Sequence, residues 1–464
     1  MMINYESFIK SKKLKHTPSG HECQITLDKA FDFQKDIIKW ALSMGKSCIF
    51  ADTGLGKTNI QLHWGLDVVR QTNKPVLGLA PLAVARQTVN EAKKFNIPCK
   101  YVRSMDDITD DINYTNYEML HHFDLSKFGG IILDESSILK SFNGTYRNNI
   151  IESSSQIPYR LACTATPAPN DLQELGNHCE FMGIMSFTEM RSMFFVNSAN
   201  TGEAWKLKAH AEKEFWDFVA SWSVMLSDPA DLGYTEQNYN LPPLKYHNKI
   251  VDTDDMSIFD NSILTLSDRN RVRRESLESR CQASADIINS SDDISIVWCN
   301  LNDESKRLTE LIDGSVEVAG SHDSEYKAEM MLKFARGDIK CLVSKPLIAG
   351  MGLNFQVCHK QVFTGLSDSY EQFYQAVRRC WRFGQKNPVD VYIVTAEKEG
   401  DVLENVMRKE KQHQSMKKVM ADRAKNITLA NLKGVEPVRS KYDVNNKMML
   451  PNFLNNIKDA EVVG

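Results

Sequence analysis

Short apolar runs alternate with segments of helical periodicity in two blocks of the chain. The first block contains KSCIFA, KPVLGLA, GGIILDE and YRLACTAT, and the second contains ISIVWCN, SVEVAGS, IKCLVSK, KQVFTGL and VDVYIVTAE. Short runs of β-branched and aliphatic residues are typical of parallel strands that are covered on both faces. Because these runs alternate with helices, the pattern predicts two α/β domains.

The pattern outside these runs gives the expected domain boundaries. Residues 175–240 are helical and aromatic in pattern, residues 252–280 are polar and charged, and a charged helical pattern begins just after residue 400. We therefore expect an N-terminal extension (1–24), a first lobe (25–250) with a helical insertion at about 175–240, a linker (251–280), a second lobe (281–400) and a helical tail (401–464).

Composition excludes some classes of protein. The 464 residues are too many for one core, and no apolar run is long enough to span a membrane. The N-terminus does not have the pattern of a signal peptide, and ten scattered cysteines without a CxxC pair indicate reduced thiols in a cytoplasm. A net charge of −4 argues against unspecific coating of nucleic acid, although a local basic groove would be enough for binding.

The segment CIFADTGLGKTNIQLHW predicts a strand, a glycine-rich loop and a helix. Its residues 51–58 fit the phosphate-loop pattern, with alanine in the first glycine position. Glycines let the backbone N–H groups of such a loop point at phosphate oxygens, and the following helix adds the positive end of its dipole. The expected ATP-binding residues are Thr53, Gly54, Leu55, Gly56, Lys57 and Thr58. Lys57 would reach the β- and γ-phosphates, and Thr58 would bind Mg²⁺.

The run GGIILDESS ends in two acids, Asp134 and Glu135. Ligands of open α/β sheets bind at the carboxyl ends of the strands, where these acids are expected. Asp134 would hold Mg²⁺ and Glu135 would orient the attacking water. A lone Asp-Glu pair is ordinarily a solvated turn, but its position after an apolar strand and downstream of a phosphate loop favours the catalytic interpretation. Thr164 and Thr166, in LACTATPAPN, either bridge these acids to a groove or form a strand-end turn.

The motifs ADTGLGKT, LDESS and TATP resemble motifs I, II and III of superfamily 2 helicases. The resemblance implies two RecA-like parallel-sheet lobes in tandem, with ATP and Mg²⁺ between them. Gln34, in DFQKDIIKWAL, matches the glutamine that reads adenine in this family, and a helix-surface glutamine is the alternative.

The resemblance extends to the motifs that contact nucleic acid. LAPLAVARQ is similar to motif Ia, YTNYEML to a short motif with a tyrosine, SIVWCNLND to motif IV and VSKPLIAGMGLNFQ to motif V. Turns, caps and lobe packing remain the alternatives for these positions. The implied nucleic-acid contacts are Pro81, Tyr117, Lys140, Thr164, Thr166, Asn300 and Asn354, and Gly352 is assigned to the nucleotide.

The stretch QAVRRCWRFGQ predicts a helix over residues 370–383 that Gly384 helps to end. No acidic residue stands among its arginines, and a solvated charged face is the ordinary alternative. Two faces follow from helical spacing: an apolar one (Phe373, Ala376, Val377, Cys380) and a polar one (Gln375, Arg379, Arg382), with Arg378 beside the latter. The stretch resembles motif VI of the Swi/Snf-like, or chromatin-remodeller-like, branch. This implies that Arg379 and Arg382 are arginine fingers, whose planar guanidinium groups stabilise phosphate charge.

The sequence also departs from that branch. Ser136 and Ser137 follow the acid pair in place of alanine and histidine, Arg378 replaces a preferred glycine, and Trp381 stands where histidine is common. The overall pattern looks most like compact motors encoded by bacteriophages. That resemblance implies the cytoplasm of a bacterial host, with phage or host replication and recombination proteins as possible partners.

These observations predict an ATP-dependent motor that translocates on or remodels double-stranded DNA. An RNA helicase and a single-strand annealing helicase remain as alternatives, and the RFGQ ending argues against the first. A third alternative is a nucleotide-gated scaffold with slow ATPase, against which the intact Lys57, Glu135 and both arginines argue. The sequence does not predict an oligomeric state.

Overall fold

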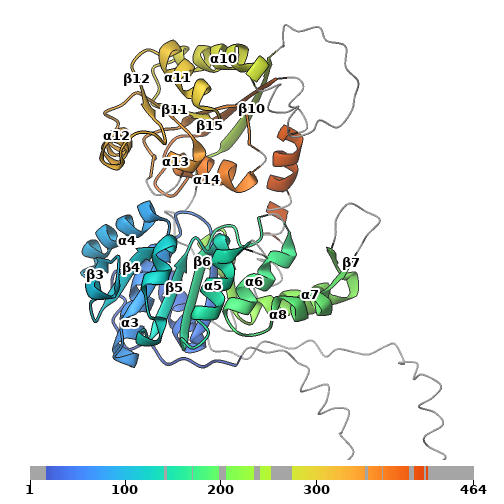
Figure 1. The fold of residues 1–464 in the computed structure, drawn as a ribbon. Coiled ribbons are helices and arrows are strands. Elements are labelled where there is room, and N and C mark those ends of the chain that lie inside the picture. Colours follow the sequence, from blue (N-terminus) through green and yellow to red (C-terminus); the bar gives the residue numbers. More distant parts are fainter. Residues whose placement is uncertain are drawn as a thin grey trace, which may run out of the picture.

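The computed structural model describes residues 17–140, 144–169, 171–197, 205–234, 241–251, 274–350, 354–367, 369–396 and 402–411, together with positions 414, 415 and 418. Figure 1 shows two lobes, one above the other, each with helices around its own sheet. Among the described residues, no helix is both long and apolar enough to cross a bilayer.

The first lobe is built on a seven-stranded sheet in the order β3-β4-β2-β5-β6-β1-β9. Every pair of neighbours in this sheet is parallel. The strands are β1 (Lys46–Ala51), β2 (Val76–Ala80), β3 (Cys99–Tyr101), β4 (Ile112–Asn116), β5 (Gly130–Asp134), β6 (Tyr159–Thr164) and β9 (Ser223–Leu226).

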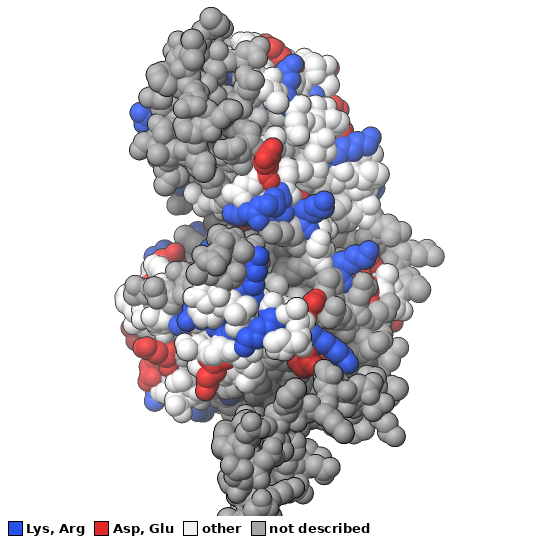
Figure 2. Space-filling model, turned by 90° about the vertical axis from the view of Figure 1, so that its right-hand side faces the viewer, with Lys and Arg blue, Asp and Glu red and all other residues white. Residues whose placement is uncertain are grey.

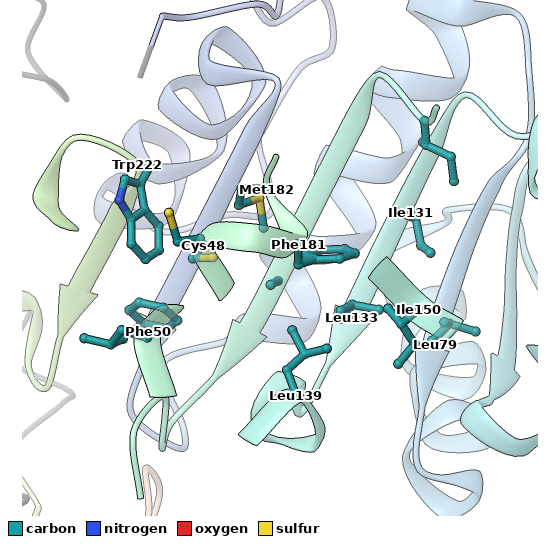
Figure 3. Packing of buried hydrophobic residues seen from close by; sticks show 14 of the residues in the cluster. Cys48, Phe50, Leu79, Ile131, Leu133, Leu139, Ile150, Phe181, Met182 and Trp222 are labelled. Atoms are coloured by element: carbon teal, nitrogen blue, oxygen red, sulfur yellow. The ribbon is translucent and has the colours of Figure 1, made fainter. Parts of the chain in front are cut away.

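Helices cover both faces of the first sheet. They are α2 (Asp32–Met44), α3 (Lys57–Thr72), α4 (Leu82–Phe95), α5 (Thr145–Ser153), α6 (Leu175–Phe181), α7 (Phe187–Phe194) and α8 (Glu212–Ala220). One face packs against apolar side chains of α2 and α3, and the other against those of α5, α6 and α8. Figure 3 shows the second face, where Phe181, Met182 and Trp222 lie against side chains of the sheet such as Cys48 and Leu133.

The second lobe is built on a six-stranded parallel sheet in the order β10-β15-β14-β11-β13-β12. Its strands are β10 (Leu244–Val251), β11 (Ser295–Cys299), β12 (Ser315–Val318), β13 (Cys341–Ser344), β14 (Lys360–Thr364) and β15 (Val389–Ala396). Its helices are α10 (Leu277–Asn289), α11 (Asn302–Leu311), α12 (Ser324–Arg336), α13 (Pro346–Ala349) and α14 (Tyr370–Cys380). These two parallel-sheet lobes confirm the predicted α/β fold class.

Three details differ from the sequence predictions. The insertion expected to be helical contains β9, which pairs with β1, and a small antiparallel pair, β7 (Phe195–Asn197) with β8 (Trp205–Leu207). A short apolar run that directly follows a helix cannot be told from more helix by periodicity, which is why β9 was not predicted. The strand β10 falls inside the range expected for the first lobe, yet it pairs with β15 over its whole length in the second.

The third difference concerns the arginine-rich helix. It ends at Cys380, so Trp381 is its C-cap and Gly384, with φ of +91°, lies in the turn that follows. The predicted apolar face is confirmed, because Phe373, Ala376, Val377 and Cys380 all lie in the core of the second lobe. Arg382 therefore lies beyond the helix, and helical spacing does not place it beside Arg379.

Candidate nucleotide site between the lobes

The carboxyl ends of three neighbouring strands bring the predicted motifs together. β5, β6 and β1 are adjacent in the sheet, with Asp134 opposite Cys163 and Phe50 opposite Thr164. Because these strands are parallel, the phosphate loop, the acid pair and the Thr164 segment all emerge at the same edge. The expected grouping of motifs I, II and III is therefore present in the structure.

The phosphate loop is curled by two glycines with positive φ, Gly54 at +91° and Gly56 at +76°. A Cβ at Gly56 would lie 2.2 Å from Nε2 of Gln34, so only glycine fits beside this side chain. Gln34 is buried and donates to the carbonyl of Leu55 at 3.0 Å. This glutamine, predicted to read adenine, is thus fixed directly against the loop that would hold the phosphates.

Lys57 begins α3, immediately after Gly56. Its ammonium donates to the carbonyls of Ala51 at 2.9 Å and Asp52 at 3.2 Å, so it lies within the curve of the loop. The positive end of the α3 dipole and this ammonium both favour an anion here. The arrangement suits the predicted binding of phosphate.

The acid pair combines burial with a strained backbone. Asp134 is buried. Its burial is the main cause that raises its pKa to about 6, and the neighbouring Glu135 carboxylate is the second. Glu135 has a φ of +54°, in the left-handed region that non-glycine residues seldom adopt. Strained residues of this kind cluster at functional sites, which agrees with a catalytic position for Glu135.

The oxygen ligands near the acid pair fit Mg²⁺ rather than a metal that needs three or more protein ligands. The described residues include no group of three or more His, Cys, Asp or Glu side chains that could hold a metal ion. Mg²⁺ is commonly held by one or two protein oxygens together with substrate phosphates and water. The carboxylate of Asp134 and the hydroxyl of Thr58 provide such oxygens, so the predicted pair fits this cofactor.

Three of the predicted nucleic-acid contacts are buried in the first lobe. Tyr117 is buried and donates to the carbonyl of Asp134 at 2.7 Å, so it supports the acid pair from behind. Thr164 and Thr166 are fully buried, and the hydroxyl of Thr164 accepts from the backbone N–H of Thr166. Their burial agrees with the alternatives of lobe packing and a strand-end turn, and their assignment as nucleic-acid contacts stays a prediction.

The other predicted contacts have different environments. Pro81 is the half-buried N-cap of α4, and the backbone N–H of Asn300 donates to Glu304 at the start of α11. Asn354 accepts from Arg382, and Lys140 pairs with Glu371. Gly352 lies outside the described residues. These five assignments remain predictions.

One face of α14 is in contact with the first lobe. Its residues follow the spacing i, i+3, i+4 and i+7: Glu371, Tyr374, Gln375 and Arg378. Glu371 accepts from Ser137 at 2.6 Å and from Lys140, while Gln375 reaches Glu135 at 3.4 Å. Sequence reasoning missed Glu371 and Tyr374, although their helical register with Arg378 was available as a signal.

Arg378, from the second lobe, makes a charged contact with the phosphate loop. Its Nη2 lies 2.9 Å from Oδ2 of Asp52, and both side chains are 5% exposed. Phe383 also packs on the first lobe, because a Cβ at Gly54 would lie 2.9 Å from the Cβ of Phe383. The acidic partner that the arginine-rich stretch lacks in its own sequence thus comes from the other lobe.

The two predicted fingers lie close to the same junction, where Arg379 is buried and Arg382 is half-buried. Arg379 donates to the carbonyl of Gly350 at 2.7 Å and to Gln375 at 3.0 Å. Burial lowers its pKa, and the Glu135 and Asp134 carboxylates act in the opposite direction. Arg382 donates to Asn354, and burial lowers its pKa to about 10. Their roles as fingers remain predictions.

Two families match this chain. The DEAD/DEAH box helicase family matches residues 31–175, which contain α2, the phosphate loop, the acid pair and the Thr164 segment. The helicase conserved C-terminal domain family matches residues 279–384, from α10 to the end of the arginine-rich stretch. Each match covers most of one lobe.

The chain was also compared with individual curated proteins and solved structures. No curated protein matches the chain. A solved structure with a similar fold is the Sulfolobus solfataricus SWI2/SNF2 ATPase core in complex with dsDNA, at 17% identity and a TM-score of 0.43. The comparison covers 90% of this chain and 100% of that one.

Proposed function

We propose that this chain, which has the paired domains of a superfamily 2 helicase, uses ATP hydrolysis to move along or remodel duplex DNA. The observation that carries the proposal is the placement of α14, from the second lobe, on the phosphate loop and acid pair of the first. A nucleotide at this loop would lie between the lobes. Its hydrolysis would therefore change the charge that both lobes contact.

The residues of the first lobe take the roles that their positions support. Lys57 holds phosphate charge, and Thr58 with Asp134 would hold Mg²⁺, which bridges and neutralises the phosphates when bound. Glu135 orients and polarises the attacking water at the end of β5. Gln34, fixed to the loop at Leu55, reads the adenine.

Arg379 and Arg382 act from the second lobe on charge that develops on the transferred phosphoryl group. An arginine in this role contributes on the order of 10³ to 10⁵ in rate. Both guanidinium groups are held by acceptors of their own lobe, Gly350 and Asn354 respectively. Small movements between the lobes would thus move both arginines together relative to Glu135.

Charge on the surface supports a nucleic acid that spans both lobes. Figure 2 shows lysine and arginine side chains on either side of the junction between the lobes. A track of this kind neutralises backbone phosphates without reading bases. The choice of duplex DNA, and the bacteriophage origin, rest on the resemblance of QAVRRCWRFGQ and its flanks to the Swi/Snf-like branch.

ATPase rates measured alone and with duplex DNA, single-stranded DNA or RNA test this proposal. Duplex DNA is expected to stimulate turnover most. Stimulation by RNA only would move the chain to the RNA helicases. If none of them stimulates turnover, the remaining interpretation is a nucleotide-gated scaffold with slow ATPase activity.

An Arg382→Ala variant tests the site itself. It is expected to abolish turnover while binding of a fluorescent ATP analogue stays largely intact, because a finger stabilises the transition state more than the ground state. The finger assignment is wrong if this variant still turns over ATP at the normal rate.

A further inference from the structure

Asp52 is a buried carboxylate inside the phosphate loop, and α14 occupies both of its oxygens. Oδ2 pairs with Nη2 of Arg378 at 2.9 Å, and Oδ1 accepts from the hydroxyl of Tyr374. The backbone N–H of Asp52 donates to Leu226 of β9, which ties the residue to its own sheet. The carboxylate is thus fixed in the first lobe, and the two donors belong to the second.

The guanidinium of Arg378 is held on its other sides as well. Its Cζ lies 4.2 Å from the centre of the Trp381 ring and 5.2 Å from that of Tyr374. Trp381 donates from Nε1 to the carbonyl of Pro242 at 2.6 Å, two residues before β10. Aromatic faces attract and orient a guanidinium. The group is therefore aimed at Asp52 and shielded from solvent.

A contact between separate cores does not help either core to fold. The cluster around Asp52 is mostly from the first lobe and the cluster around α14 mostly from the second, so this ion pair acts mainly on the distance and angle between the lobes. Electrostatics gives it a second effect. An unpaired carboxylate in the loop would repel the phosphates of a nucleotide, and the nearby guanidinium removes most of that repulsion.

We propose that Arg378 is a positioning residue of the ATPase cycle, which neutralises Asp52 and seats α14 on the phosphate loop. The adjacent Arg379 is thereby brought towards Glu135, while Trp381 and Tyr374 fix the direction of the Arg378 side chain. This inference rests on the proposed ATPase function, and it assigns a role to two residues, Arg378 and Trp381, that depart from the resembled branch.

Three variants test the pair: Arg378→Met, Asp52→Asn and the two combined. Binding of a fluorescent ADP analogue and small-angle X-ray scattering of the nucleotide-free full chain are measured for each. Arg378→Met is expected to weaken nucleotide binding by about 30-fold or more, because the unpaired Asp52 carboxylate then repels the phosphates of the nucleotide. It is also expected to increase the radius of gyration, because the lobes lose this contact.

The double variant separates the two effects. Removing the Asp52 charge should restore most of the nucleotide affinity, whereas the lobes should stay apart as in Arg378→Met. Arg378→Lys keeps the charge without the planar fork and should recover affinity in part. The matched control is Arg307→Met, since Arg307 lies on the surface of the second lobe and pairs with Glu278.

Two results would overturn the inference. One is an Arg378→Met variant with the scattering profile and nucleotide affinity of the unchanged chain. The other is a double variant that binds nucleotide as weakly as Arg378→Met alone. Failure of the proposed function would look different. It would appear as an ATPase rate that nucleic acid does not stimulate, whereas scattering and nucleotide binding would still report on the Arg378–Asp52 pair.

Discussion

Glu135, which we propose orients the attacking water, has a backbone conformation that favours glycine. Among the described residues, the other non-glycine residues with positive φ are Asn73 and Asn96, and both are C-caps of helices. Asparagine is tolerated in the left-handed region at such caps, whereas glutamate is strained there. The strain is consistent with selection for the carboxylate at this point.

A Glu135→Gly variant is expected to be more stable than the unchanged chain by about 1 kcal/mol, because glycine adopts this φ without strain. A Glu135→Gln variant keeps the strain and should show no such gain. Both should lose ATP hydrolysis. Urea unfolding of the two variants measures the difference, and equal stabilities would show that the backbone here is not strained.

His178 should make the stability of the first lobe depend on pH. It is buried beside Ser136 and Phe50, and burial lowers its pKa to about 4 from an ordinary value near 6.5. The unfolded chain therefore takes up a proton first as pH falls, and stability is lost between about pH 6.5 and pH 4. The loss should reach about 3 kcal/mol at pH 4.

A His178→Gln variant isolates this effect, because glutamine cannot take up the proton. Urea unfolding at several pH values between 7 and 4 should give a flatter curve for the variant. Parallel curves for the two proteins would contradict the assignment.

The helix α14 shows what an element can be predicted to do from its sequence. Its apolar face was readable from the spacing of Phe373, Ala376, Val377 and Cys380, and it lies in the core as expected. Its other face was read as arginines that point together. The structure instead gives that face to four residues that contact the first lobe, and Asp52 lies 326 positions from its partner Arg378.

Local sequence patterns could therefore predict most strands and the motifs at their carboxyl ends, since these depend on residues close in the sequence. They could not predict partners across the lobes. Nor did they reveal β10, because the sequence LKYHNKIV is polar at several positions and half-exposed at a sheet edge. The choice between lobe packing and a nucleic-acid contact for Tyr117 stayed open for a related reason, since burial behind Asp134 depends on how the whole lobe packs.

Glu371 is expected to couple nucleic-acid binding to hydrolysis. It joins α14 to Ser137 and Lys140, which follow the acid pair, where the resembled branch uses a histidine. A Glu371→Gln variant should keep most of its basal ATPase rate but lose most of the stimulation by duplex DNA. Glu329→Gln serves as the matched control, because Glu329 pairs with Lys333 on the surface of α12. Full stimulation in Glu371→Gln would rule out this route.

At the scale of the whole molecule, the lobes have largely separate cores, joined by Ala165 and Phe383, and should respond largely separately to damage. The second lobe contains a fully buried ion pair between Arg280 and Glu304, at 2.7 Å. Removing one partner of such a pair typically costs about 3 to 5 kcal/mol, because the other charge stays buried.

A Glu304→Gln variant should therefore destabilise the second lobe and leave the first nearly unchanged. Hydrogen exchange followed by mass spectrometry can assign protection to each lobe. Glu278→Gln, which breaks an exposed pair with Arg307, should have little effect on either. Equal loss of protection in both lobes would mean that they unfold as one unit.

The strand β10 and the helix at residues 402–411 matter for anyone who wishes to produce the second lobe alone. A fragment cut at the family match, residues 279–384, would lack both β10 and β15, so β14 would become an unpaired edge of the sheet. It would also lose Val402 and Val406 from the core, and the acceptor of Tyr370, which is Glu410 at 2.6 Å. A soluble fragment should therefore run from about residue 241 to at least residue 411.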